Sequence, residues 1–107
     1  MNGKKFNWIL EKRLAKTKEV LASKSAEYST DSNKLHNFDR GATMTGKLRE
    51  EVLLGFALKH HISILDMVDN ISKNILPTEV LVDEKIGDLI NYLILLEASI
   101  KERIEDK

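Results

Sequence analysis

The sequence of 107 residues has no cysteine, one proline, five glycines and no net charge, because 17 basic residues balance 17 acidic ones. The absence of cysteine excludes a disulfide scaffold, a thiolate zinc site and a cysteine nucleophile. The balanced charge argues against bulk electrostatic binding of nucleic acid, which usually needs a basic excess. The longest apolar run covers only residues 92–96, far short of the ~20 residues that span a bilayer. The N-terminus also lacks an apolar signal core, so we expect a cytoplasmic protein without a membrane segment.

The scarcity of glycine and proline, with no sustained alternation of apolar and polar residues, predicts an all-α fold. A chain of this length corresponds to one domain, residues 1–107. We expect three main helices and a short extra turn, at residues 7–27, 34–38 (the turn), 47–73 and 79–105. Polar residues at 29–33 and an irregular stretch at 39–46 separate the first segments. Pro77 ends the third segment, and Thr78 is the expected N-cap of the last helix.

Both later helices carry apolar residues on more than one face. Because a small domain buries only a limited fraction of its surface, we expect a helical bundle completed by homo-oligomerisation, as a dimer or a tetramer. Charge is also unevenly distributed. Residues 1–24 hold seven basic and two acidic residues, whereas residues 78–107 hold four basic and eight acidic ones. These ends either attract each other, within a fold or between subunits, or form two solvated helix faces.

The stretch most informative for function lies in the last helix, where Glu84 and Asp88 share one helix face. Asn91 continues this face toward apolar positions, so the face enters the protein interior. Two carboxylates at this spacing repel each other, and Mg²⁺ would neutralise them, since it favours a few carboxylates with phosphate oxygens and water. A salt bridge from Lys85 to Asp88 is the alternative. Gly87 costs ~1 kcal/mol in a helix interior, which indicates close approach of another helix or a ligand.

A second charged stripe lies on the helix predicted at 47–73, where Glu51, Gly55 and Lys59 follow at intervals of four residues. This stripe would face the acidic pair of the last helix across a cleft. Lys59 would either neutralise a phosphate there or be a solvated lysine. The alternative for Glu51 is a favourable interaction with the helix dipole. His60 and its neighbour His61 cannot form the i, i+4 pair that chelates zinc. His60 is therefore either a ligand contact or a satisfied core or interface histidine.

Three residues beside the first predicted break combine aromatic rings with an amide: Tyr28, Asn37 and Phe38. Such a set suits stacking on a base and recognition of its edge. The alternative is that these residues anchor a loop on the core.

Together these features resemble the all-α nucleoside triphosphate pyrophosphatase (MazG-like) superfamily, in particular the small phage and prophage proteins described as nucleotide-modification-associated. The segments that carry the resemblance are residues 24–28, 37–38, 58–60 and 84–93. The resemblance implies an oligomeric helical bundle in which acidic residues on two adjacent helices hold Mg²⁺, which binds a triphosphate. It further implies that a metal-activated water cleaves between the α- and β-phosphates, giving a monophosphate and pyrophosphate. A phage-encoded chain would act in the host cytoplasm.

The sequence departs from the family pattern at both acidic motifs. The first motif, Glu-x-x-Glu, is broken because leucines stand three residues after Glu50 and Glu51. In the second motif, usually Glu-x-x-Asp, Lys85 stands three residues before Asp88, and the acidic residue, Glu84, stands four before it. Two of the four usual carboxylates are therefore missing or displaced.

We accordingly expect a nucleotide-binding homo-oligomer whose metal ligands are Glu51, Glu84 and Asp88. The expected contacts to the nucleotide are Lys59, His60, Lys85, Asn91, Tyr92, Asn37 and Phe38. One version of the function is Mg²⁺-dependent hydrolysis of a nucleoside triphosphate to a monophosphate and pyrophosphate. Another is non-catalytic sequestration of a nucleotide in a phage–host conflict. The alternative from a different class is a helical protein-interaction module with no ligand site.

Overall fold

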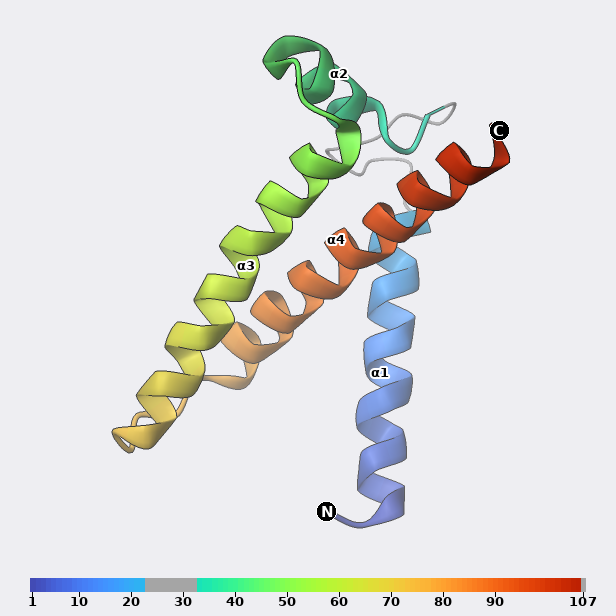
Figure 1. Cartoon of the computed structure of the whole chain (residues 1–107). Helices are drawn as coiled ribbons and strands as arrows, with labels where there is room; N and C mark the ends of the chain where they lie inside the picture. Colours follow the sequence, from blue (N-terminus) through green and yellow to red (C-terminus); the bar gives the residue numbers. More distant parts are fainter. Residues whose placement is uncertain (23–32, 107) are drawn as a thin grey trace.

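The computed structural model describes residues 1–22 and 33–106, which form four α-helices (Figure 1). The helices are α1 (Gly3–Ala22), α2 (His36–Thr45), α3 (Arg49–Ser72) and α4 (Glu79–Glu105). Within these described ranges there is no strand, which confirms the predicted all-α class. The bounds of α3 and α4 agree with the prediction to within two residues. The predicted end of the first helix at 23–27, Tyr28 and the start of the polar break lie outside the described residues.

The prediction was wrong between the first two long helices. We predicted one helical turn and then an irregular stretch over 39–46, but α2 is a continuous helix of ten residues. Gly41 allows α2 to approach α3 closely, because a Cβ at this position would lie only 3.1 Å from Val52 Cγ1. The helix ends at Gly46, which has a left-handed φ of 71° and donates its N–H to the Ala42 carbonyl. Packing on α3 thus outweighs the low helix propensity of this segment.

A short turn reverses the chain between α3 and α4. Asn74 in this turn has a φ of 64°, a conformation that asparagine tolerates better than most residues. Pro77 follows, and Thr78 caps α4 as predicted, because its Oγ1 accepts a hydrogen bond from the Leu81 N–H at 3.2 Å. α4 packs against α3 and against α1 (Figure 1). It is therefore the helix that positions both neighbours.

The buried apolar core is small and consists of Leu35, Phe38, Leu53, Ala57, Met67 and Leu95. The chain exposes 8125 Å² of surface, whereas a compact monomer of 12.2 kDa exposes about 6,100 Å². Its radius of gyration is 16.1 Å, compared with about 13 Å for a compact domain of this length. The single chain is therefore open, with much apolar surface uncovered. None of the described helices combines the length and apolar content that a membrane span needs.

Candidate functional site

A cleft of about 280 Å³ lies between α1 and the first half of α4. Its lining residues are Arg13, Lys16, Thr17 and Val20 from α1, and Asp83, Glu84, Gly87, Asp88 and Asn91 from α4. The two walls differ in charge, because α1 contributes only basic charges and α4 only acidic ones. The attraction expected between the basic first segment and the acidic last one thus occurs within a single chain, at this cleft.

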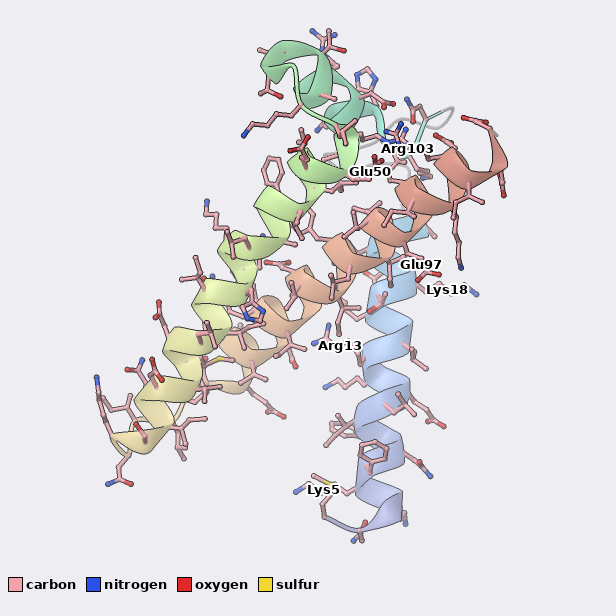
Figure 2. The ribbon with its side chains drawn as sticks, in the orientation of Figure 1. Lys5, Arg13, Lys18, Glu50, Glu97 and Arg103 are labelled. Atoms are coloured by element: carbon pink, nitrogen blue, oxygen red, sulfur yellow. The ribbon has the colours of Figure 1, made fainter. Side chains whose placement is uncertain are left out.

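Arg13 anchors α1 on α4 and projects from α1 toward it (Figure 2). Its Nη2 donates a hydrogen bond to the Asp83 carbonyl at 3.0 Å and lies 3.7 Å from Asp83 Oδ1. A Cβ at Gly87 would lie 2.5 Å from Arg13 Nη1. The guanidinium therefore takes the space that a side chain at Gly87 would need. This confirms the close approach predicted there, and the approaching group is an arginine of another helix.

Two buried oxygens in the cleft wall lack hydrogen-bond partners. Thr17 Oγ1 and Asn91 Oδ1 are both buried, and neither has a partner among the described residues. Most buried side-chain polar atoms in proteins are paired, and an unpaired one costs about 1–3 kcal/mol. A donor group of a bound molecule would satisfy such an oxygen. Both oxygens belong to residues that line the cleft.

Asp88 connects the cleft to an aromatic cluster between α2, α3 and α4. Its Oδ2 lies 3.6 Å from His60 Nδ1. The His60 ring stacks on Tyr92 at 5.1 Å between centroids, and Tyr92 stacks on Phe56 at 5.7 Å. Phe38 meets Tyr92 and Phe56 edge-on and is only 2% exposed. The predicted contacts His60, Tyr92 and Phe38 therefore lie together, but in a packed cluster beside the cleft.

The remaining predicted nucleotide contacts are spread over three helices. Asn91 lines the cleft. Lys85 Nζ lies 3.9 Å from Glu84 Oε1, so this lysine is placed beside Glu84 and not, as the alternative had it, beside Asp88. Lys59 is exposed on α3, and Asn37 is exposed on α2. The structure thus brings Glu84, Asp88 and Asn91 to one cleft. Lys59 and Asn37 do not line this cleft.

The predicted metal ligands do not come together as one group. Glu51 Oε1 accepts a hydrogen bond from the Leu48 N–H at 3.0 Å at the start of α3, and nine residues of helix, about 13 Å, separate it from His60 beside Asp88. Among the described residues, no three His, Asp or Glu side chains are grouped to hold a metal ion. Glu84 and Asp88 supply two carboxylates, which suits Mg²⁺ that keeps water and phosphate oxygens as its other ligands.

A second polar cluster, which the sequence analysis missed, joins α2, α3 and α4. This cluster, termed the clasp, consists of Asp39, Arg49, Glu50, Ser99, Glu102 and Arg103. Arg49 Nε donates to the fully buried Ser99 Oγ at 2.7 Å, and its Nη1 donates to Asp39 Oδ1 at 3.1 Å. Its Nη2 lies 2.9 Å from Glu102 Oε1. Burial alone lowers the pKa of Arg49, but the hydrogen bonds to Glu102 and Asp39 outweigh it and raise the pKa.

Glu50 completes the clasp and faces Arg103 across the helix pair (Figure 2). It accepts a hydrogen bond from the Ser99 hydroxyl, and its Oε1 lies 2.8 Å from Arg103 Nε and 2.7 Å from Nη2. Burial alone raises the pKa of Glu50, but the hydrogen bonds from Ser99 and Arg103 lower it below its ordinary value of 4.5. Because its charges are paired with one another, the clasp holds helices together. The sequence feature that could have indicated this cluster is Ser99, because it lies one turn after Leu95 on the same helix face. Both residues are buried in the structure, so the Ser99 hydroxyl needs polar partners there.

The α1–α4 cleft is the candidate site, because it combines opposite charges on facing walls with two unpaired buried oxygens. Comparison of the chain with protein-family models, curated proteins and solved structures finds no significant match. What the site can do therefore follows from its own geometry and charge.

Proposed function

We propose that this chain binds a phosphorylated nucleotide in the α1–α4 cleft and that Mg²⁺ enters together with the nucleotide. The main support is that the two walls of the cleft carry opposite charges. Arg13 and Lys16 line it from α1, and Glu84 and Asp88 line it from α4. Guanidinium and ammonium groups bind phosphate oxygens. Two carboxylates complete the coordination of a Mg²⁺ that a phosphate already holds. The resemblance to the MazG-like superfamily supports the same class of ligand.

The space around the cleft suits a molecule with one charged and one flat end. The cleft alone is slightly below the roughly 300–1,000 Å³ of typical ligand pockets. It adjoins a groove of about 680 Å³, and the two share Arg13, Lys16 and Asp83. The groove wall includes Trp8, which is half exposed, with Lys12 Nζ 4.6 Å from its ring centroid. Phosphates in the cleft would thus leave the base beside an exposed indole, a surface suited to stacking.

Binding without turnover is the version that this geometry favours. Bound Mg²⁺ would neutralise phosphate charge and make a coordinated water more acidic. Arg13 and Lys16 would hold the phosphates, and the Asn91 side chain would orient the ligand through its unpaired oxygen. Asp83, Glu84 and Asp88 line the cleft, but Asp83 is paired with Arg13, and no three His, Asp or Glu side chains of the described residues are grouped to hold a metal ion. Hydrolysis to a monophosphate and pyrophosphate is the second version.

Calorimetric titration with a panel of nucleoside triphosphates, with and without Mg²⁺, tests the proposal. Lys16→Gln and Lys18→Gln form a matched pair, because both remove one positive charge from α1. Lys16 lines the cleft, whereas Lys18 is exposed away from it (Figure 2). We expect Lys16→Gln to weaken binding about tenfold, the cost of one charged hydrogen bond, and Lys18→Gln to leave it unchanged. Asp88→Asn should remove the dependence of binding on Mg²⁺.

The results of this titration distinguish nucleotide sequestration from hydrolysis and from the absence of a site. Binding of no nucleotide, with or without Mg²⁺, would contradict the proposal. Equal weakening by Lys16→Gln and Lys18→Gln would show attraction by the whole basic helix and not by the cleft. Release of monophosphate and pyrophosphate during the titration would establish hydrolysis, and a nucleotide recovered intact from the denatured complex would establish sequestration.

A second candidate function is a helical protein-interaction module without a ligand site. It is favoured by the large apolar side chains exposed on α1, α3 and α4. This candidate predicts no nucleotide binding and a chain that needs a different protein to cover its apolar surface. A purified chain that forms a stable homo-oligomer would cover that surface without such a partner.

A further inference from the structure

The outer face of α3 carries a regular apolar stripe. Leu54, Leu58, Leu65 and Val68 lie along it, and each is more than half exposed. The full set of positions, termed the α3 seam, is Leu54, Leu58, His61, Leu65, Val68 and Ser72. They follow one another at alternating intervals of four and three residues. This is the heptad spacing of helices that pack knobs into holes along a shared seam.

The seam belongs to a face of α3 that the rest of the chain leaves uncovered. The buried side chains of α3 are Leu53, Ala57 and Met67, and each directly precedes a seam residue in the sequence. Neighbouring residues of a helix point about 100° apart, so the face that packs on α2 and α4 is not the face of the seam. A heptad stripe on a soluble helix requires a second helix to cover it.

We propose that two copies of this chain associate through the α3 seam, with their α3 helices antiparallel. A two-fold axis presents the same patch on both copies, and the seam is complementary to itself in this orientation. Its layers then pair Leu58 with the second copy's Val68, His61 with the second copy's Leu65, and Leu54 with the second copy's Ser72, each twice. The histidine–leucine layers lie at the centre, the wholly apolar Leu58–Val68 layers flank them, and the serines lie at the two ends.

Charges beside the seam favour the antiparallel orientation over the parallel one. Lys59 lies on one side of the seam toward its start, and Asp66 and Asp69 lie on the same side toward its end. Antiparallel helices bring this side of the two copies together and place Lys59 of each copy near the two aspartates of the other, whereas parallel helices would set this side of each copy against the opposite side of the other. Glu51 and Lys73 repeat this relation at the ends of α3. Such flanking pairs add little affinity, but they select the orientation.

The surface that the chain exposes in excess is sufficient for such a dimer. The chain exposes 8125 Å², about 2,000 Å² more than a compact monomer of its mass. A specific interface of standard size takes about 800 Å² from each partner. The seam from Leu54 to Ser72 extends over about 27 Å of helix, long enough for the contact to run along most of α3.

This dimer is independent of the proposed nucleotide site. The seam lies on α3, whereas the cleft lies between α1 and α4, so pairing through the seam leaves the cleft accessible. A chain that dimerises but binds no nucleotide would uphold the seam and contradict the proposed function. A monomer that binds a nucleotide would do the reverse.

Sedimentation velocity of the full chain tests the dimer with a matched pair of variants, Val68→Glu and Val80→Glu. Both valines are exposed, at 54% and 75%, but only Val68 belongs to the seam. Val80 lies in the first turn of α4, where a glutamate suits the helix dipole. We expect the native chain and Val80→Glu to sediment at twice the chain mass of 12.2 kDa. Val68→Glu should weaken the dimer at least about 100-fold, since it places two carboxylates in an apolar contact.

Circular dichroism shows whether Val68→Glu keeps its helices, so that dissociation is distinguished from unfolding. A native chain that remains monomeric at high micromolar concentration would overturn the proposal. So would an assembly that resists Val68→Glu or is lost equally in Val80→Glu.

The orientation is tested by disulfide crosslinking, which the absence of cysteine makes specific. Leu58→Cys and Val68→Cys are refolded separately and as a mixture, oxidised mildly, and examined for covalent dimers. In the antiparallel dimer only the mixture should crosslink, because residue 58 of one copy faces residue 68 of the other. Two copies of the same variant would hold their thiols about 15 Å apart along the axis, too far for a disulfide. Crosslinking of each variant with itself, without a covalent dimer that joins the two different variants, would indicate parallel helices and overturn the proposed arrangement.

Discussion

The effect of Gly87→Ala on stability should depend on whether Arg13 is present. In an Arg13→Ala background the space beside Gly87 is open, and alanine should stabilise α4 by about 1 kcal/mol relative to glycine. With Arg13 in place, the new Cβ would lie 2.5 Å from Nη1, so the guanidinium must leave its hydrogen bond to the Asp83 carbonyl. That bond contributes about 1.5 kcal/mol, the lower end for a charged donor, because Arg13 is partly exposed.

Gly87→Ala in the native chain should therefore lower the free energy of unfolding by about 0.5 kcal/mol, and the double-mutant cycle should give a coupling of about 1.5 kcal/mol. The assay is urea unfolding of the four variants, followed by far-UV circular dichroism at one fixed protein concentration. Gly55→Ala on α3 is the control, because a Cβ there meets nothing within 4 Å. It should stabilise by the same amount with and without Arg13. If Gly87→Ala also behaved additively, Arg13 would not lie against Gly87 and the α1–α4 packing described above would be incorrect.

Three other predictions concern the core, the clasp and the N-cap of α4. Leu53→Ala should lower the free energy of unfolding by about 2–5 kcal/mol in chemical denaturation, because it removes a fully buried side chain; a loss below 1 kcal/mol would contradict its place in the core. Glu50→Gln should lower the melting temperature at neutral pH. Since the folded pKa of Glu50 is below 4.5, its stabilisation is present above that pH and lost as the pH falls through the lowered value, so the two melting temperatures should converge in acid. Thr78→Ala should cost about 1 kcal/mol in urea unfolding, because it removes the cap on the Leu81 N–H, and Thr78→Ser should recover most of it.

Local signals explain why the last two helices were predicted closely. α3 ends at Ser72, a few residues before Pro77, in a turn where Asn74 has a positive φ. Thr78 starts α4 through a hydrogen bond to the Leu81 N–H three residues away. α2 has a local stop signal in Gly46, but its N-cap, Leu35, offers no capping side chain at its start. Its threonines and glycine have low helix propensity, and the helix exists because Gly41 lets it pack against Val52 of α3, a contact between elements that no local pattern encodes.

The candidate site, too, was predicted only where the signal lay within one helix. The spacing of Glu84 and Asp88 placed them on one face, and both line the cleft. Arg13 completes that cleft, but its partner Asp83 is 70 residues away in the chain. Periodicity gives the direction of a side chain on its own helix but not which helix lies opposite. For that reason Glu51 was grouped with the acidic pair, although its carboxylate caps α3.

The unequal attachment of the helices has a consequence for how a ligand would enter and leave. The clasp ties α2, α3 and α4 to one another, whereas α1 packs chiefly on α4 and carries the whole basic wall of the cleft. Local opening that detaches α1 therefore dismantles the site while the other helices stay folded, at a lower free energy than global unfolding. A molecule that bridges the two walls would suppress this opening. Its affinity would include the free energy of keeping α1 docked, and slowed amide hydrogen exchange in α1 would report its binding.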